Sequence, residues 1–370
     1  LGTRLGKKSQ NCPKPMQPIN NEPFLNNILW NLKRYGIKEI ILLVSYLAEN
    51  FKNYYINGKE FGLKISYVKE EIPAGTGGAL KLCAEQNKLD NHFLLINGDT
   101  LFDINYHDLA RNFSEKEICH LALNYVENVS RYGEVISENG KIIDFKEKGG
   151  SNSGYINGGV GIFNKKVIDF ISSTPSSLEK DIFPKLIKNK LISSHKFNSF
   201  FLDIGIPESL KAAEELIPDW RSKFALFLDR DGVINNDLGY VHSMENFQWI
   251  KYAKETIKLA NDLGILVIVV TNQAGIARGF YTENVFKSFS SEINDQLIEF
   301  GAHIDETYFC PHHPIEGIGV LKKDCECRKP KPGMLKKALS DWNLNAEKCF
   351  LIGDKETDIK AAEKCGISSY

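Results

Sequence analysis

Apolar segments of strand length alternate with amphipathic segments of helix length along the whole chain. In the first half, for example, Phe24, Ile28 and Leu32 recur at helical spacing. The pattern there predicts helices over 23–35 and 208–216, strands over 39–44 and 93–96, and a hairpin over 134–145 that turns at Asn139-Gly140. This alternation is typical of an α/β architecture.

A second set of alternating elements begins after Pro218. The pattern predicts strands over 224–228, 265–270 and 349–352 and helices near 253–263, 282–300 and 357–364. Polar residues suited to ligand binding stand directly after these strands, where open parallel sheets bind ligands. We therefore expect two Rossmann-like α/β domains, 1–217 and 223–370, with a parallel sheet in the second.

The composition agrees with two soluble domains. A chain of 370 residues is too long for one ordinary core, and 42% hydrophobic and 25% charged residues are typical of globular proteins. The net charge of −1 argues against a nucleic-acid surface, and the longest apolar runs are too short to span a membrane. No signal peptide is visible, and no pattern specifies an oligomeric state. Because the chain opens at Leu1 and stops at Tyr370 in what resembles a starting strand, we expect a fragment of a longer protein.

Three of the eight cysteines lie within eighteen residues, beside two histidines. Cys310-Pro-His312 and Cys325-Glu-Cys327 supply three thiolates and one imidazole, a closed tetrahedral set suited to structural Zn2+. His313 fits this spacing less well and would instead meet substrate or solvent. Buried cysteines without a metal are the alternative interpretation. The clustering favours a metal site over a disulfide framework, and hence a reducing cytoplasm.

Two carboxylates, Asp229 and Asp231, stand two residues apart at the end of the predicted strand 224–228, and Gly232 then lets the chain turn sharply. A carboxylate so placed can attack phosphorus while its neighbour serves as general acid and base. Their crowded negative charge needs a cation, and oxygen ligands beside a phosphate favour Mg2+. A solvated turn is the alternative interpretation of these residues alone.

Three later segments add groups that suit a phosphate ester. They are Thr271 and Asn272 at a strand end, the proline-stiffened Arg328 and Lys329, and Asp354 and Lys355 after another strand. In this order the four segments resemble the haloacid dehalogenase-like phosphatases, and the resemblance covers 224–370.

That resemblance implies a role for each group. Asp229 would be the nucleophile that becomes an aspartyl-phosphate, and Asp231 would protonate the leaving oxygen and then activate water. Thr271 and Lys329 would hold the phosphoryl group. Mg2+ would bind Asp229, Asp231 and Asp354, and Lys355 and Asp358 would stand near this metal site. Asn272, Arg328 and Lys355 are candidates for substrate binding.

The cysteine-containing stretch over 310–334 narrows the resemblance to a subgroup of these phosphatases. It is similar to the D-glycero-D-manno-heptose-1,7-bisphosphate 7-phosphatases, and the histidinol-phosphate phosphatases carry a similar loop. In those families the metal fixes a loop that shapes the pocket, which implies a structural role for Zn2+. The segment 272–279 also resembles this group, so Arg278 is a candidate to meet a substrate phosphate or hydroxyl; a surface arginine without a role is the alternative.

The opening of the chain offers groups for a triphosphate. Gly2 and Thr3 stand in a turn where backbone N–H groups can approach phosphate, Arg4 can neutralise it, and Lys14 is fixed between two prolines. These residues resemble the start of the nucleotidyltransferases that join a sugar 1-phosphate to a nucleoside triphosphate. The family's first strand and two earlier glycines are absent, because the chain starts too late. The resemblance implies a mixed sheet lacking its first strand.

Later landmarks follow in the order of that family across 1–215. They are the nucleotide-contacting loop with Gly75, Gly77 and Gly78, the Mg2+ ligands Asp99 and Asp203, and the sugar-binding elements Glu147, Lys148, Asn157 and Gly158. Each is weak alone, since glycine-rich turns and aspartates after strands are common. By this resemblance Mg2+, Arg4 and Lys14 would align the reactants for in-line attack on the α-phosphorus.

Together the two halves indicate consecutive steps in making a nucleotide-activated heptose. The phosphatase would remove the 7-phosphate of D-glycero-D-manno-heptose 1,7-bisphosphate, and the transferase would join the heptose 1-phosphate to a nucleotide. The opening most resembles guanylyltransferases, which favours GTP. Two alternatives remain. One is a histidinol-phosphate-like or other sugar phosphatase joined to a mannose- or glucose-1-phosphate nucleotidyltransferase. The other is a phosphatase with a non-catalytic nucleotide-sugar sensing domain.

Overall fold

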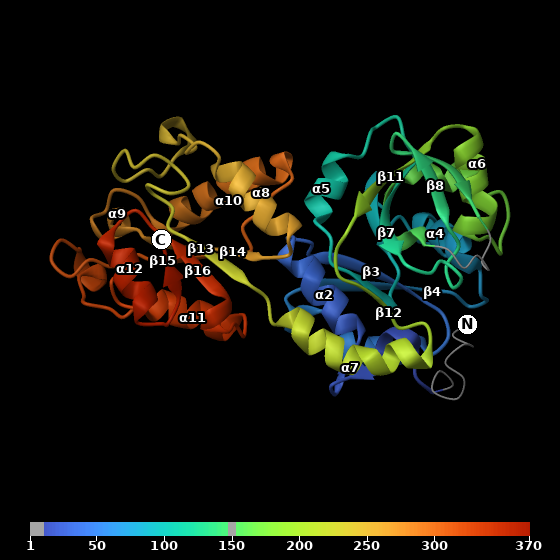
Figure 1. Cartoon of the computed structure of the whole chain (residues 1–370), viewed down its shortest axis with the longest axis horizontal. Coiled ribbons are helices and arrows are strands. Elements are labelled where there is room, and N and C mark those ends of the chain that lie inside the picture. Colours follow the sequence, from blue (N-terminus) through green and yellow to red (C-terminus); the bar gives the residue numbers. More distant parts are fainter. Residues whose placement is uncertain (1–10, 147–152) are drawn as a thin grey trace. The chain divides into compact units, whose positions relative to one another are not determined.

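The computed structural model describes residues 11–146 and 153–370, and the chain divides into two compact units (Figure 1). The first comprises the described residues of Leu1–Ile104 and Asn112–Ile217. The second comprises Asn105–Arg111 and Pro218–Tyr370. Asn105–Arg111 thus groups with the second unit, although its neighbours in sequence on both sides belong to the first.

A six-stranded mixed sheet forms the centre of the first unit. Its strands, in spatial order, are β5 (His92–Ile96), β10 (Gly154–Asn164), β7 (Cys119–Val126), β11 (Ile192–Phe197), β9 (Lys141–Phe145) and β8 (Val135–Glu138). β7 and β11 run parallel, whereas the other neighbours are antiparallel. The expected mixed sheet is therefore confirmed. The predicted hairpin is also present, because Asn139 (φ 48°) and Gly140 (φ 76°) both adopt the left-handed conformation that its two-residue turn requires.

Three two-stranded sheets accompany this central sheet. They are the pairs β1 (Pro18–Ile19) with β2 (Glu22–Pro23), β3 (Glu39–Val44) with β4 (Lys64–Lys69), and β6 (Thr100–Phe102) with β12 (Phe201–Asp203). Helices of this part of the chain are α2 (Leu25–Arg34), α3 (Ala48–Tyr55), α4 (Gly75–Glu85), α6 (Phe183–Lys188) and α7 (Pro207–Arg221). Short helical turns are η2 (Lys14–Met16), η3 (Lys59–Phe61), η4 (Lys165–Phe170) and η5 (Leu178–Ile182).

α7 continues beyond the residue at which the sequence pattern predicted its end. We expected the helix to stop at 216, before Pro218. Pro218 lies inside the helix instead, and the N–H of Ser222 donates to its carbonyl at 3.0 Å, so the helical bonding continues past the proline. Because Pro218 has no N–H, α7 lacks one backbone hydrogen bond at this position but does not end there.

The second unit is built on a five-stranded sheet in which every pairing is parallel. Its strands, in spatial order, are β15 (Glu306–Cys310), β14 (Leu266–Asn272), β13 (Ala225–Leu228), β16 (Cys349–Ile352) and β17 (Ser368–Ser369). Its helices are α5 (Tyr106–Arg111), α8 (Ala253–Asp262), α9 (Ala274–Ala277), α10 (Glu283–Phe300), α11 (Gly333–Asp341) and α12 (Glu356–Glu363), with short turns η6 (Met244–Asn246), η7 (Gly319–Leu321) and η8 (Ala346–Lys348). The predicted parallel sheet is confirmed, whereas the sequence pattern had not indicated β15 or α11.

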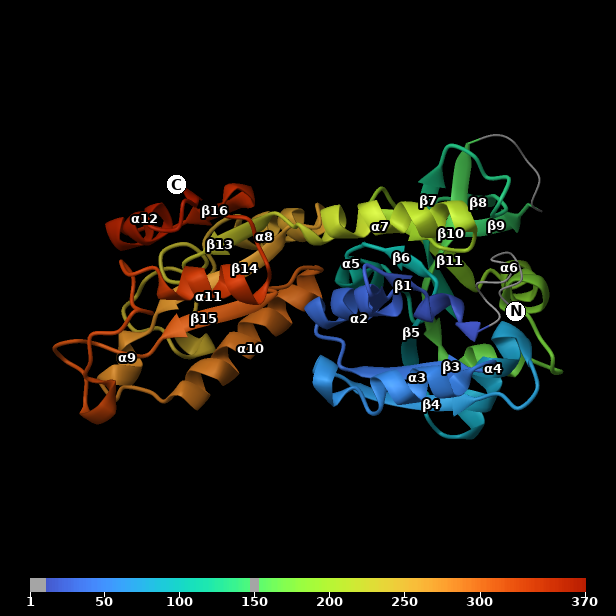
Figure 2. The same ribbon diagram turned by 90° about the horizontal axis from the view of Figure 1, so that it is seen from below.

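Helices cover both faces of this parallel sheet (Figures 1 and 2). Leu228 on β13 and Val267 on β14 pack toward α8 and α10. Their neighbours Phe227 and Ile268 pack on the opposite side, toward α11 and α12. Such two-sided burial explains why these strands are continuous apolar runs and do not alternate with polar residues.

The strand order brings the polar residues after three strands to one edge. β13 lies between β14 and β16, and all three run in the same direction. Their carboxyl ends therefore meet, which places Asp229, Thr271 and Asp354 at one edge of the sheet. Among the helices of the described ranges, none combines the length and the apolar composition needed to cross a bilayer.

Candidate active sites

Three carboxylates meet at the edge of the second unit's sheet. Asp229 follows β13, Asp354 follows β16 and Asp358 lies in the first turn of α12, and their ligand oxygens all lie within 4.8 Å of one another. Asp229 and Asp358 are 6% and 0% exposed. Like charges so close and so buried repel one another, so this acidic cluster calls for cations.

Lys329 supplies one cation to the acidic cluster. Its Nζ lies 3.0 Å from Asp229 Oδ1 and 2.5 Å from Asp358 Oδ1, and it donates to the Val270 carbonyl at 2.7 Å. Asn272 holds the lysine backbone at both ends, accepting from its N–H at 3.0 Å and donating to its carbonyl at 3.1 Å. The ammonium is therefore fixed beside the predicted nucleophile.

Burial raises the pKa of the Asp229 carboxyl above its ordinary value. The positive charge of Lys329 opposes this rise, and the negative charge of Asp358 adds to it. The net direction means that the metal-free site disfavours the ionised nucleophile. A bound divalent ion would favour the ionised form, because it places positive charge directly on the carboxylate.

Two glycines leave room for the carboxylates of the acidic cluster to lie close together. Gly232 has φ 90°, and a Cβ built on it would lie 2.2 Å from Asp354 Oδ2. A Cβ on Gly353 would lie 2.3 Å from the Cβ of Asp358. Any side chain at either position would push a carboxylate out of the cluster, so both glycines are required by the close approach.

Asp231, predicted both as the acid and base and as a metal ligand, lies outside the acidic cluster of Asp229, Asp354 and Asp358. The guanidinium of Arg230 donates to both of its carboxylate oxygens, at 2.8 and 2.9 Å. Asn235 donates to it at 3.0 Å and Gln273 at 3.2 Å. These three partners were not predicted; only the position of Gln273 directly after Thr271 and Asn272 gave a signal.

The other predicted substrate-binding residues of this unit have protein partners. Lys355 Nζ lies 2.9 Å from Asp237 Oδ2, and Arg328 donates to the carbonyl of His312 at 3.2 Å. Arg278 pairs with Glu316, and its guanidinium lies over a tyrosine ring, 5.3 Å from the ring centre. Of these three, Lys355 alone reaches the acidic cluster, since its Nζ also lies 3.8 Å from Asp354 Oδ2.

The four predicted zinc ligands converge. The sulfur of Cys310 lies 3.5 Å from that of Cys325 and 3.2 Å from that of Cys327, and the latter two are 3.3 Å apart. His312 Nδ1 lies 3.3 Å from the Cys327 sulfur. Tetrahedral zinc–thiolate geometry separates sulfurs by about 3.8 Å, so a small outward movement would admit the ion. Burial raises the pKa of the Cys310 thiol in the metal-free protein.

The first unit contains a cavity of about 730 Å³ in which several predicted residues meet. Lys14, Gly75, Asp99 and Asn157 all line it, and Lys14 Nζ lies 3.4 Å from Asp99 Oδ2. A cavity of this size can hold a nucleotide together with part of a second molecule.

Asp203 lies at the end of β12, next to the strand that follows Asp99. The register pairs Asp203 with Thr100, and the N–H of Ile204 donates to the Asp99 carbonyl at 3.1 Å. The guanidinium of Arg131 lies 3.7 Å from Asp203. The fold thus brings together two predicted metal ligands that are about a hundred residues apart in sequence.

The predicted glycines of this unit either bond to other backbone groups or lie where no side chain would fit. The N–H groups of Gly77 and Gly78 donate to the carbonyl of Ser176, at 2.9 and 3.3 Å, so neither is directed at the cavity. A Cβ on Gly75 would lie 2.4 Å from that carbonyl oxygen, and one on Gly158 would lie 2.4 Å from the ring of Phe102. Gly2, Thr3, Arg4, Glu147 and Lys148 lie outside the described residues.

Two family models match the chain. Residues 1–219 match the model described as nucleotidyl transferase, and residues 326–370 match the model described as HAD-hydrolase-like. The first match covers Asp203 and the cavity of the first unit, which Lys14 and Asp99 line. The second covers Asp354 and Asp358 of the acidic cluster and the adjacent Lys329.

Individual relatives divide the chain in the same way. It is 39% identical over 217 residues to the D-glycero-alpha-D-manno-heptose 1-phosphate guanylyltransferase of Aneurinibacillus thermoaerophilus, covering 58% of this chain and 94% of that protein. It is 43% identical over 148 residues to the D-glycero-beta-D-manno-heptose-1,7-bisphosphate 7-phosphatase of Haemophilus ducreyi, covering 40% of this chain and 81% of that protein.

A solved structure supports the first match. The chain resembles HddC from Yersinia pseudotuberculosis at 32% identity with a TM-score of 0.54, over 59% of this chain and 95% of that one. A second structure of HddC, complexed with GMP-PN, gives a TM-score of 0.53. The chain therefore belongs to the nucleotidyl transferase family in its first 219 residues and to the HAD-like heptose-bisphosphate phosphatases in its second half.

Proposed function

We propose that this chain performs two consecutive steps in making a guanosine-activated heptose. Its second unit hydrolyses the 7-phosphate of D-glycero-D-manno-heptose 1,7-bisphosphate, and its first unit transfers a guanylyl group from GTP to the heptose 1-phosphate. The observation that carries this proposal is the convergence of Asp229, Asp354 and Asp358 around Lys329 at the sheet edge. The relatives matched by each half support the choice of substrates.

In the phosphatase step an oxygen of Asp229 attacks the phosphorus of the 7-phosphate. Asp231 gives a proton to the leaving sugar oxygen, and later takes one from the water that hydrolyses the aspartyl-phosphate. Lys329 and Thr271 hold the phosphoryl oxygens. Mg2+ held by Asp229 and Asp354, with Asp358 beside them, would shield the like charges and offset charge on the phosphoryl group. Asp231 is assigned to proton transfer because its carboxylate is not part of that cluster and accepts from Arg230 and Gln273 instead.

In the transferase step a phosphate oxygen of the heptose 1-phosphate attacks the α-phosphorus of GTP, and pyrophosphate leaves. Lys14 lines the cavity and is placed to offset charge on the phosphates. Asp99 and Asp203 would hold Mg2+, and the ion would supply positive charge that offsets the charge of the phosphates. Arg4, outside the described residues, is proposed to assist from the glycine turn.

We assign Zn2+ to Cys310, His312, Cys325 and Cys327. Its role would be structural, because four protein ligands leave no open position for chemistry. The ion would fix the segment that leads directly into Lys329. Thiolate ligands and a nucleoside triphosphate substrate both suit a reducing cytoplasm, where we place the protein. Its partners in these reactions are small phosphorylated molecules.

The test is a coupled assay of the purified two-unit protein. Given heptose 1,7-bisphosphate and GTP, the natural enzyme should release one phosphate and one pyrophosphate for each GDP-heptose formed. Asp229→Asn should form product only from heptose 1-phosphate, whereas Asp99→Asn should release phosphate but no pyrophosphate. ATP and CTP, assayed beside GTP, test the base. Failure to release phosphate from the bisphosphate, with good hydrolysis of another ester, would overturn the proposal.

A further inference from the structure

A chain of hydrogen bonds joins a pocket wall to Asp231 in the second unit. The hydroxyl of Tyr281 donates to Gln273 Oε1 at 2.6 Å. The amide nitrogen of Gln273 donates to Asp231 Oδ2 at 3.2 Å and to Thr271 Oγ1 at 2.9 Å. Gln273 is 2% exposed, so water does not compete for these bonds. One buried amide therefore contacts two residues that the phosphatase step uses.

The Tyr281 hydroxyl and the Asp231 carboxylate together fix which way this amide faces. A carboxamide presents one accepting oxygen and one donating NH2 group. With the oxygen accepting from Tyr281, the NH2 group faces the carboxylate of Asp231. The opposite orientation would place the amide oxygen against a carboxylate oxygen, and two acceptors repel. Thr271 accepts from the same NH2 group, which leaves its own O–H proton to donate to a phosphoryl oxygen.

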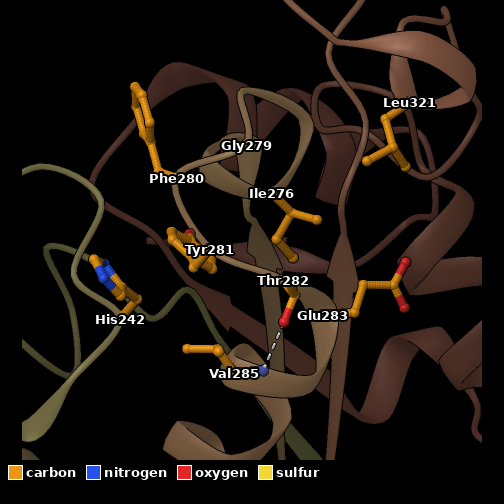
Figure 3. Close-up of a pocket in the computed structure, with 9 residues that line it drawn as sticks. All are labelled: His242, Ile276, Gly279, Phe280, Tyr281, Thr282, Glu283, Val285 and Leu321. Carbon is orange, nitrogen blue, oxygen red and sulfur yellow. Dashed lines mark hydrogen bonds between the residues drawn. The ribbon is translucent and has the colours of Figure 1, made fainter.

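Tyr281 is itself held firmly. Its ring stacks on that of His242, with the ring centres 4.6 Å apart and the planes at 14°. Figure 3 shows both side chains on the wall of a cavity of about 530 Å³. A Cβ on Gly275 would lie 2.3 Å from the Tyr281 ring, so that position must be glycine for the ring to approach. Burial raises the pKa of Tyr281 to about 12, which keeps the phenol protonated as a donor.

We propose that Tyr281 and Gln273 form a positioning relay that holds Asp231 in the orientation from which it protonates the leaving sugar oxygen. The inference rests on the proposed phosphatase function and adds two residues that act through Asp231. As the bond from phosphorus to the ester oxygen breaks and the bond to Asp229 forms, the proton of Asp231 moves to that oxygen. Without the Tyr281 hydroxyl, the amide of Gln273 loses the bond that anchors its oxygen, and its donor bond to Asp231 is no longer held in one direction.

The nature of the leaving group separates this role from simple support of the fold. A sugar alkoxide is a poor leaving group and needs the proton, whereas p-nitrophenolate is stable as an anion and leaves without it. A positioning defect should therefore reduce kcat/KM for sugar phosphates and leave kcat/KM for p-nitrophenyl phosphate nearly unchanged. A defect in folding or in phosphate binding should reduce both.

The experiment compares Tyr281→Phe with the natural enzyme on heptose 1,7-bisphosphate and on p-nitrophenyl phosphate. We expect kcat/KM for the sugar ester to fall about tenfold and that for the aryl ester to change by less than about twofold. Tyr308→Phe is the matched control, since it removes a tyrosine hydroxyl that donates to the exposed carboxylate of Asp341 at 2.8 Å and not to a relay residue. It should leave the ratio between the two esters unchanged.

A second variant tests the same relay at Gln273. Gln273→Glu places a like charge beside Asp231 and should lower the sugar-ester rate more than Tyr281→Phe does, again with the smaller effect on the aryl ester. Equal losses on both esters, or no loss on either, would overturn the relay while phosphatase activity remains. A natural enzyme that hydrolyses neither ester would instead overturn the phosphatase function, and the relay with it.

Discussion

The two sites differ in how their lysines are placed. In the second unit the Lys329 side chain is 2% exposed and lies against two carboxylates. In the first unit the Lys14 side chain is 20% exposed and has one carboxylate at 3.4 Å, beside a wide cavity. A covalent step at a buried carboxylate requires charges that are already desolvated and fixed. Nucleotidyl transfer requires placed charges around a space that admits two substrates.

The comparison predicts its largest effect at Lys329. Lys329→Met removes the cation between Asp229 and Asp358 and leaves two buried carboxylates unpaired. We expect a loss of about 3–5 kcal/mol in the unfolding free energy of the second unit. Hydrogen exchange of the amides in β13 and β14 measures this in the whole chain. Phosphate release should also be lost, whereas guanylyl transfer to heptose 1-phosphate should persist. Unchanged protection of these strands would contradict the buried ion-pair network.

Zinc should also affect the placement of Lys329, because the predicted zinc ligand Cys327 lies only two residues before it. Cys327→Ser should lose bound zinc, and with it the anchor of the segment that carries the buried cation. At free zinc a hundred times its Kd, the ion would stabilise the natural protein by about 2.7 kcal/mol. Metal analysis and melting curves at several zinc concentrations measure both effects. Cys365→Ser is the control and should keep its zinc; retention of zinc by Cys327→Ser would refute the assignment.

The placement of Asp229, Thr271 and Asp354 at one edge of the sheet could be predicted, because each stands at a strand end and the sheet is parallel. The sequence pattern indicated the strands 224–228, 265–270 and 349–352, and the structure supplies their order. The partners of Asp231 could not be predicted in the same way. Arg230 and Asn235 reach it through the path of a loop, and loop geometry does not follow from hydrophobic periodicity.

The first unit shows where motif recognition reaches its limit. Gly77 and Gly78 resemble a nucleotide-contacting loop, yet their N–H groups bond the carbonyl of Ser176. Ser176 lies about a hundred residues away in the sequence, and no local pattern predicts that contact. Lys14 and Asp99 were predicted as a placed cation and a metal ligand, because flanking prolines and a strand end constrain them locally, and both line the cavity.

A smaller effect on stability is expected at Lys14. Lys14→Ala removes a partly exposed pair, so the unfolding free energy of the first unit should change by less than about 1 kcal/mol. The kcat/KM for guanylyl transfer should nevertheless fall by about ten- to a hundredfold, because the charge acts on the phosphates. Lys64→Ala is the matched control: Lys64 pairs with Glu39 at 3.0 Å on the surface, and its loss should leave transfer unchanged. Equal effects of the two variants on transfer would remove Lys14 from the site.

The smallest effect concerns the charge on Asp229 in metal-free protein. Burial raises its folded pKa above the unfolded value, and this rise persists although Lys329 opposes it. The folded state therefore binds this proton more readily, so the residue favours folding below the unfolded pKa, and that contribution is lost as pH rises through the folded pKa. Asp229→Asn carries no charge at any pH. In EDTA it should melt above the natural protein at pH 7, and the advantage should vanish below about pH 3.9, where the unfolded carboxyl is also protonated. A melting difference that persists unchanged at low pH would show that packing, and not the cost of burying the charge, separates the two proteins.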